Sequence, residues 1–283
     1  MRKPHWIIIP LLASVLALSA FKAPTPSGDE LAPPEVPGEV VYVPFPVAIT
    51  LDGKLDDWKD VPVQTVTKRS STSTGPDDPA ENGSFTFSLA ADETNFYITM
   101  QMPDKNIVAG QHSTGFWNED SFEFYLNLSG VLNATDYNAD IHQVNINAAD
   151  IGNTDPDALT ITGLNAPSLK VRGVVFKTET GWGFEAAVPL GKIKPEHGLS
   201  IGFQAQINGA SQLDRDIKLI WSNADTADQS WQNPSLFGQA IFFNAGATDI
   251  PTPLPTLPPP TATSLPTWPK LALPHSGYNF YKE

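Results

Sequence analysis

Two tryptophans stand in polar segments where a hydrophobic core does not explain them. Trp117 lies in the run GFWNE and Trp231 in the run QSWQN. An exposed aromatic ring can stack against the apolar C–H face of a sugar, while neighbouring polar groups fix the orientation of the ligand. A loop tryptophan is about equally often a partly buried anchor. The pair therefore marks a candidate aromatic platform, and the polar groups around it decide the interpretation.

Polar side chains with period two could supply those groups. Successive side chains of a strand point to opposite faces, so the expected strands 121–128, 141–148 and 201–208 each carry one polar face. These faces hold Glu123, Tyr125 and Asn127; Gln143, Asn145 and Asn147; and Gln204, Gln206 and Asn208. If the strands are neighbours in one sheet, the polar groups line a single surface, and amides match sugar hydroxyls because both donate and accept hydrogen bonds. The alternative is a solvated outer face, which period-two amphipathicity alone also produces.

Carboxylates crowd one segment and raise the question of catalysis. Glycoside hydrolysis uses two carboxyl groups about 5.5 Å or ~6.5–9.5 Å apart, and Glu119, Asp120 and Glu123 are close in sequence. Asp120 and Glu123, however, point to opposite faces of the expected strand. The sequence has neither a GxSxG nucleophile motif nor HExxH metal-binding spacing. We therefore expect that this chain is not an enzyme; the alternative is a fragment of a secreted glycoside hydrolase.

A second alternative is a haem-binding redox sandwich, because similar domains elsewhere bind haem through a Met and a His. Met100, Met102 and His142 could serve that purpose. Both methionines alternate in phase with Phe96 and Ile98, and a buried apolar face accounts for them without a cofactor. We expect core packing here and no cofactor for catalysis.

The elements that must position these residues are short strands. Hydrophobic residues repeat with period two between runs of Gly, Asn and Asp, and helical periodicity fits poorly throughout. Residues 84–89 and 96–102 form an expected hairpin around the turn 92–95, and Trp182 and Trp221 alternate with apolar neighbours as core residues do. Trp58 at an early turn is also expected to be structural. Further strands are expected near 47–50, 61–67, 141–148, 171–176, 182–188, 201–208, 217–221 and 239–243. The prediction is an all-β fold: an antiparallel, jelly-roll-like β-sandwich of about ten strands.

Proline and charge divide the 283 residues into three parts. Nine of the 27 prolines lie in residues 1–46, nine in 47–249 and nine in 250–283, so only the middle has ordinary proline content. The middle part also holds 26 of the 31 acidic residues and accounts for the whole net charge of −14. An acidic surface disfavours nucleic acid and anionic membranes and suits a neutral ligand. With no cysteine, disulfides, thiol nucleophiles and thiolate metal sites are excluded.

The ends indicate export and tethering. Arg2 and Lys3 precede a twelve-residue apolar stretch and a small-residue cleavage signal, which is typical of a secretory signal peptide at 1–19. We expect disordered Pro-rich flanks: a spacer at 20–46 and a Pro/Thr-rich linker at 250–274 before a short tail at 275–283. The prediction is a secreted, extracellular protein without a membrane anchor after cleavage, whose globular domain spans 47–249.

Four motifs resemble those of family 9 carbohydrate-binding modules, in that family's order. They are ITLDGKLDDW at 49–58, WNEDSFE at 117–123, GWGFEAAVP at 181–189 and WQNPSLFG at 231–238. The resemblance covers essentially all of 47–245. It implies a β-sandwich that binds sugars between two tryptophans, often at glycan chain ends, and that commonly holds structural calcium.

Carried onto this sequence, the resemblance implies that Trp117 and Trp231 form the sandwich and that Glu123 hydrogen-bonds sugar hydroxyls. Gln143, Gln206 and Arg215 fall where further polar contacts are expected. Two positions depart from the pattern: Phe122 stands where a basic residue is expected, and Asp228 stands where an amide is. The departures concern sugar type and the preference for chain ends.

For calcium, Asp104 and Asp120 are candidate ligands, since hard cations take carboxylate oxygens. Each also has a purely structural interpretation, as a strand-end turn and a loop cap, so the sequence assigns no metal site. The resulting prediction is a secreted, non-catalytic module that binds polysaccharide or oligosaccharide. It would target an attached or associated glycoside hydrolase during polysaccharide catabolism, since a tethered binder raises effective concentration.

Overall fold

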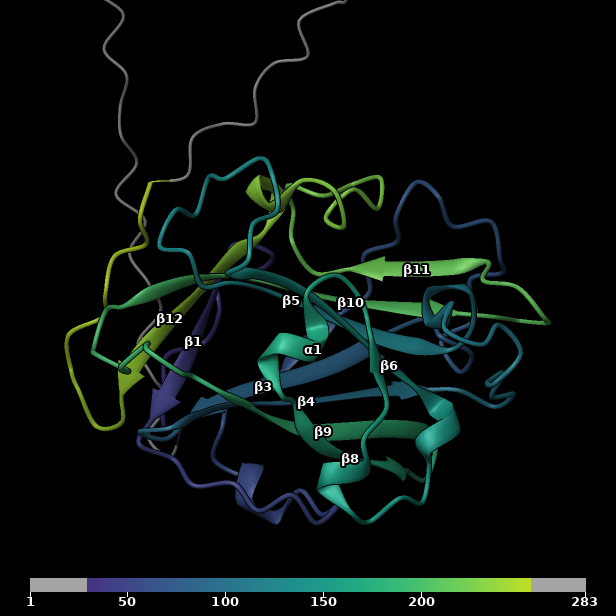
Figure 1. Ribbon diagram of the computed structural model, residues 1–283, viewed down its shortest axis with the longest axis horizontal. Helices are drawn as coiled ribbons and strands as arrows, with labels where there is room; N and C mark the ends of the chain where they lie inside the picture. Colours follow the sequence, from purple (N-terminus) through teal and green to yellow (C-terminus); the bar gives the residue numbers. More distant parts are fainter. Residues whose placement is uncertain (1–29, 256–283) are drawn as a thin grey trace, which may run out of the picture.

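The computed structural model describes residues 30–255, which form two β-sheets packed face to face (Figure 1). The seven-stranded sheet has the order β1-β12-β10-β5-β6-β7, with β11 paired to β10, and the five-stranded sheet has the order β2-β3-β4-β9-β8. The strands are β1 Val40–Phe45, β2 Gln64–Val66, β3 Phe85–Ala91, β4 Asn95–Pro103, β5 Ser121–Asn127, β6 Ile141–Asn147, β7 Ile161–Thr162, β8 Arg172–Lys177, β9 Gly181–Pro189, β10 Ser200–Gly209, β11 Ile217–Ile220 and β12 Gly238–Asn244. The only α-helix in this part of the chain is α1, Ala166–Leu169. The predicted all-β sandwich is confirmed.

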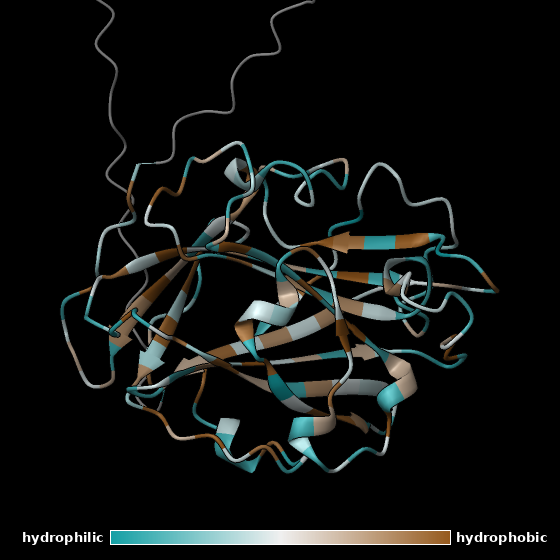
Figure 2. Ribbon diagram, in the orientation of Figure 1, coloured by the Kyte–Doolittle hydropathy of each residue, from teal (hydrophilic) through white to brown (hydrophobic). Residues whose placement is uncertain are grey.

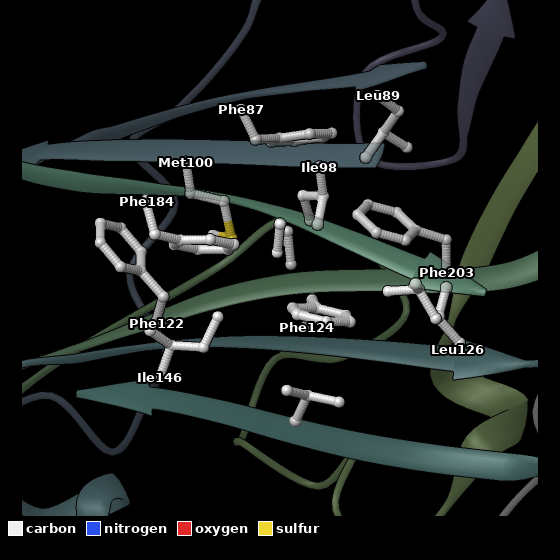
Figure 3. Packing of buried hydrophobic residues seen from close by; sticks show 14 of the residues in the cluster. Phe87, Leu89, Ile98, Met100, Phe122, Phe124, Leu126, Ile146, Phe184 and Phe203 are labelled. Carbon is white, nitrogen blue, oxygen red and sulfur yellow. The ribbon is translucent and has the colours of Figure 1, made fainter. Parts of the chain in front are cut away.

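The core lies between the sheets and is built from the alternating residues. Phe87, Met100 and Phe184 project from the five-stranded sheet toward Phe122 and Phe124 of β5 (Figure 3). The Phe122 ring lies 4.4 Å, centroid to centroid, from Trp182, which is fully buried as expected. Figure 2 shows hydrophobic residues concentrated on the strands and hydrophilic stretches in many of the connecting loops. Period-two alternation thus determines which side chains meet between the layers.

The first motif, residues 49–58, packs on the outer face of the five-stranded sheet. Buried Glu185 accepts hydrogen bonds from the backbone N–H of Asp52 and of Gly53, each at 2.6 Å, and from Trp58 Nε1 at 3.2 Å. Burial raises the pKa of Glu185, and these donors oppose that shift. Trp58 is buried in a satellite cluster with Ile49 and Tyr97. The expected structural role of Trp58 is confirmed.

The N-terminal boundary of the folded domain differs from the prediction. Within the expected spacer at 20–46, β1 pairs in parallel with β12, and Trp221 Nε1 donates to Glu35 at 2.9 Å. Residues 47–50, expected as a strand, are irregular. Proline composition misled the prediction because β1 is an edge strand, where a proline such as Pro44 leaves no ladder hydrogen bond unmade. The domain therefore begins before residue 40.

The C-terminal boundary also shifts. Gln239 Nε2 donates to the carbonyl of Leu254 at 2.7 Å, and its Oε1 accepts from the N–H of Leu254 at 3.0 Å. Ile250 packs against the cluster around Tyr42 and Phe243. Residues 250–255 are therefore part of the fold and not of a free linker. The expected signal peptide, the rest of the linker and the tail lie outside the described residues.

Candidate functional site

The three polar strand faces form one surface. In the seven-stranded sheet β5 lies between β6 and β10, and the register places Gln206, Glu123 and Asn145 side by side. One pleat along, Gln204, Tyr125 and Gln143 align in the same way. The prediction that these strands are neighbours is confirmed. Most of these side chains are covered by the loops above them, so the alternative of an open solvated face is wrong.

Glu123 is the centre of this polar floor. Its carboxylate accepts a short hydrogen bond from the Tyr125 hydroxyl, one from Asn208 Nδ2 at 2.7 Å and one from Gln143 Nε2 at 3.4 Å. The Lys218 ammonium lies 3.2 Å away. Four groups on four different strands thus fix the orientation of one buried carboxylate.

Two cations and a second carboxylate extend the floor. Arg215 Nη1 donates to Asn208 Oδ1 at 2.9 Å and to Asp228 Oδ2 at 2.8 Å, and Lys218 Nζ lies 3.3 Å from Asp228 Oδ1. Burial alone would raise the pKa of Asp228, but the charges of Lys218 and Arg215 hold that pKa below its usual range. Lys218 was not predicted from the sequence. A lysine between Ile217 and Leu219 in an apolar strand nevertheless indicates a buried charge with a partner.

The Trp117 loop, residues 104–120, carries the first aromatic side chain. Trp117 lies in the short 3-10 helix η2, Phe116–Asn118, and is 50% exposed. Below it, buried Glu119 accepts from the N–H of Gly110 at 3.0 Å, from the N–H of Gln111 at 2.7 Å and from Asn147 Nδ2. Burial would raise the pKa of Glu119, and these donors lower it below its usual value. Glu119 therefore shapes the loop that presents Trp117.

The Trp231 loop, residues 221–237, carries the second. Trp231 is 52% exposed. Buried Asp225 accepts from the N–H of Ala227 at 3.1 Å, from the N–H of Gln229 at 3.0 Å and from the N–H of Ser230 at 2.8 Å. It also accepts from Gln206 Nε2 at 3.4 Å. Asp225 was missed by the sequence analysis, because its partners come from backbone turns that no residue pattern specifies.

The structure brings most predicted site residues into one network. Glu123 and Gln143 are directly hydrogen-bonded, and Gln206 joins them through the Tyr125 hydroxyl at 3.3 Å. Arg215 reaches Glu123 through Asn208 and stands 5.6 Å from the Trp117 ring centroid. Trp231 follows Ser230, whose hydroxyl accepts from Gln204 Nε2 at 3.1 Å. Both tryptophans are thus connected to the polar floor.

The carboxylates considered for catalysis are engaged in structure. Asp120 Oδ2 accepts from the N–H of Val108 and Asp120 Oδ1 from the N–H of Ala210, while Glu119 holds the Trp117 loop. The residues considered for haem are buried: Met100 and Met102 lie in the core (Figure 3 labels Met100 among aromatic rings), and His142 Nδ1 lies 3.1 Å from the carbonyl of Asn165. Core packing of the methionines is confirmed.

A buried oxygen cluster stands at the base of the Trp117 loop. Asp104 Oδ2 and Asn82 Oδ1 are buried without a hydrogen bond of standard geometry; the groups that face Asp104 are the Trp182 indole N–H and the Asp120 carboxyl, and Asn82 Nδ2 lies 3.5 Å from Asp120 Oδ1. Burial raises the pKa of Asp104, and burial together with the Asp104 charge raises the pKa of Asp120 to about 8. Two adjacent carboxylates and an orphaned amide oxygen fit a hard cation such as calcium, which takes further oxygens from backbone and water. Across residues 30–255, no three His, Asp or Glu side chains converge on such a point.

Helices within residues 30–255 are all too short or too polar to traverse a lipid bilayer.

Comparison with known proteins gives a consistent result. The model of a family described as carbohydrate family 9 binding domain-like matches residues 51–245. Endo-1,4-beta-xylanase A of Thermotoga neapolitana is 26% identical over 189 residues, which are 66% of this chain and 16% of that protein. Endo-1,4-beta-xylanase A of Thermoanaerobacterium saccharolyticum is 25% identical over 195 residues, 68% of this chain and 15% of that protein. The match therefore spans about one sixth of these relatives.

Among solved structures, the chain is similar to a family 9 carbohydrate-binding module from Caldicellulosiruptor kristjanssonii in complex with cellotriose. The TM-score is 0.59 at 22% identity, over 77% of this chain and 100% of that one. This similarity supports the sandwich fold.

Proposed function

Because the chain belongs to the carbohydrate family 9 binding domain-like family, we propose that its two half-exposed tryptophans hold a neutral sugar over the Glu123 floor. The matched domain is a binding module and not a hydrolase domain. One observation carries the proposal: Trp117 and Trp231 stand on separate loops that are both connected to one buried network of carboxylate and amide groups.

The ligand chemistry follows from the floor. Gln143 is the partly exposed amide of the floor and can both donate to and accept from a sugar hydroxyl, whereas Glu123 and Gln206 are buried and support the floor from below. Arg215 can only donate hydrogen bonds. Within residues 30–255 its guanidinium group donates from Nη1 alone, which leaves Nη2 and Nε for a ligand. Stacking supplies apolar burial, and the buried polar groups supply orientation.

The names of the relatives narrow the candidates to β-1,4-linked glucose or xylose oligomers, since those relatives are endo-1,4-beta-xylanases and a similar structure holds cellotriose. We propose that the chain is exported and directs an attached or associated glycoside hydrolase to polysaccharide. The relatives support this role, because the region they share with this chain is a small part of a longer enzyme. Depletion of the protein from solution by insoluble xylan or cellulose tests it.

Titration calorimetry with glucose, xylose and their β-1,4 oligomers tests binding directly. Removing an aromatic hot spot costs about 2 kcal/mol or more, so Trp117→Ala and Trp231→Ala should each weaken binding about thirtyfold or more. Val63→Ala truncates another exposed apolar side chain, far from the site in sequence, and serves as the control. Unchanged affinity in both tryptophan variants would refute the aromatic sandwich. Affinity that grows with oligomer length would argue against recognition of chain ends.

We propose calcium for the cluster of Asn82, Asp104 and Asp120, supported by its two orphaned oxygens. A bound cation would neutralise the paired carboxylates and stabilise the base of the Trp117 loop. Asp104 also lines a surface cleft of about 780 Å³.

A further inference from the structure

Arg215 contacts both tryptophan-bearing loops. Its guanidinium carbon lies 5.6 Å from the Trp117 ring centroid, within the range of a cation–π interaction. Its Nη1 donates at 2.8 Å to Asp228, which stands three residues before Trp231 in the Trp231 loop. Arg215 itself belongs to neither loop, because it lies in the connection between β10 and β11.

We propose that Arg215 and Asp228 form a clamp that sets the position of Trp117 relative to Trp231. Both are then positioning residues for the aromatic gap, apart from any contact that either makes with the sugar. The inference rests on the proposed function, since the gap matters only if a ligand enters it. It goes beyond that function by assigning the geometry of the gap to one ion pair.

The clamp is built to hold its shape. The Arg215 and Asp228 side chains are only 20% and 10% exposed, so water competes weakly for the pair. Both ends are fixed by other contacts: Arg215 N–H donates to the carbonyl of Asn118 at 2.9 Å, next to Trp117, and Lys218 supports Asp228 from the floor. A pair anchored at both ends loses little conformational entropy when it forms, unlike an exposed ion pair.

The backbone at Asp228 gives a second sign of constraint. Asp228 has φ of 55°, in the left-handed region that non-glycine residues other than Asn and Asp rarely adopt. This conformation persists where the surroundings over-determine it. Asp tolerates this conformation better than most residues do, and the two cations hold its carboxylate within the turn that leads to Trp231.

The charges of the clamp also balance those of the floor. Arg215 and Lys218 face Asp228 and Glu123, so two cations meet two carboxylates in these direct ion pairs. Removing one member leaves a buried charge without its partner, and that charged side chain is then expected to move toward water or another polar group. Loss of Asp228 should therefore release Arg215, and through Arg215 the Trp117 ring.

The test measures the 19F resonances of the two tryptophans in the absence of ligand. Protein labelled with 5-fluorotryptophan is recorded by 19F NMR, and Trp117→Phe and Trp231→Phe assign the two resonances. We expect Asp228→Asn to shift the Trp117 resonance, although no hydrogen bond within residues 30–255 joins these two side chains. In the Arg215→Met background the same substitution should shift it no further. The exposed pair Arg172–Asp157 provides the control, as Arg172→Met and Asp157→Asn should leave both resonances in place.

Binding gives the second measurement. We expect Arg215→Met and Asp228→Asn each to weaken glycan affinity about tenfold and the double variant to lose little more, because coupled residues are non-additive. A Trp117 resonance unmoved by Asp228→Asn, or losses that multiply to about a hundredfold, would overturn the clamp. If Asp228→Asn does not fold, Arg215→Met provides the same test from the other end of the clamp: we expect it to shift the Trp231 resonance. Wild-type protein that binds no glycan would refute the proposed function and leave the ligand-free NMR test of the clamp intact.

Discussion

The Trp117 loop and the Trp231 loop are each shaped by a buried carboxylate, but the two carboxylates are connected to the rest of the domain in different ways. In each, a buried carboxylate accepts backbone N–H groups and shapes the turn that presents a half-exposed tryptophan. Asp225 also bonds directly to Gln206 of the floor. Glu119 bonds instead to Asn147 at the end of β6, and its loop is held further by a chain of side chains through His112 and Asp214.

The two loops form the two walls of the proposed site. The difference indicates that the Trp231 loop is the fixed wall and the Trp117 loop the adjustable one. The Trp231 loop is held by buried contacts: Asp225 on its backbone N–H groups, Tyr137 through a 2.7 Å hydrogen bond to the Ser230 carbonyl, and Asp228 paired with Lys218. The Trp117 loop also has a buried carboxylate, Glu119, but it relies in addition on the partly exposed His112–Asp214 contact and on the oxygen cluster at its base, while the Arg215 clamp joins both loops. We expect perturbations of the Trp231 loop to be severe and general, and those of the Trp117 loop to be smaller and condition-dependent.

The largest effect should come from Asp225→Asn. The substitution turns an acceptor oxygen into a donor that faces the N–H groups of Gln229 and Ser230, and unsatisfied buried groups are costly. We expect a loss of about 3 kcal/mol in the free energy of unfolding, measured by urea denaturation. Asp136→Asn, in the exposed loop between β5 and β6, is the matched control. A loss no greater than that of the control would show that the Trp231 loop is not held by this carboxylate.

Removal of the proposed calcium ion should have the next largest effect, and it should act on the Trp117 loop only. If calcium is present at about one hundred times its Kd, chelation costs about 2.7 kcal/mol of stability. EDTA should then lower Tm and shift the 19F resonance of Trp117 while leaving that of Trp231 in place. Asp104→Asn should abolish the response to EDTA, since it removes one of the two carboxylates. Equal Tm with and without EDTA would contradict the proposed site.

A smaller loss, about 1.5 kcal/mol, is expected for Glu119→Gln, because other contacts retain the Trp117 loop. The sign of its pH dependence is defined. Folding lowers the pKa of Glu119, so its contribution is present above the unfolded-state value of about 4.3 and is lost as pH falls through the folded-state value. Urea denaturation of wild type and Glu119→Gln at pH 7 and pH 3 should show a larger difference at pH 7 than at pH 3. A larger loss than that of Asp225→Asn would reverse the comparison of the two loops.

The strand residues of the site can be predicted from the sequence. Alternation along β5, β6 and β10 places Glu123, Gln143 and Gln206 on one face, because strand geometry alone fixes which side chains share a side. The exposure of Trp117 and Trp231 is readable from their polar neighbours. The edge strand β1 was missed because Pro44 and its neighbours look like linker composition, although an edge position tolerates proline.

The loop anchors could not be predicted from pattern. Asp225 and Glu119 act through backbone N–H groups, which every residue but proline possesses, so no residue type marks their partners. Lys218 and Asp228 meet only because β11 returns beside β10 and the Trp231 loop folds back over it. Local periodicity specifies faces and strands, whereas these contacts depend on the relative placement of whole loops.

The smallest effect concerns His112, which joins Glu119 at 3.3 Å and Asp214 at 2.9 Å. Partial desolvation would lower the pKa of His112, but its hydrogen bonds to Asp214 and Glu119 and their charges raise it above the usual value. A group whose pKa rises on folding adds stability below its unfolded-state pKa, near 6.5, and loses it as pH rises through the folded-state value.

Wild type should therefore exceed His112→Gln in stability at pH 5.5, and the margin should shrink by pH 8.5. Asp214→Asn should flatten this profile, because it removes the nearer carboxylate. Since the Trp231 loop has no histidine, its 19F resonance should stay constant over the same pH range while that of Trp117 moves. A Trp231 resonance that titrates together with Trp117 would mean that the two walls respond as one unit, and the contrast between a fixed and an adjustable wall would then be wrong.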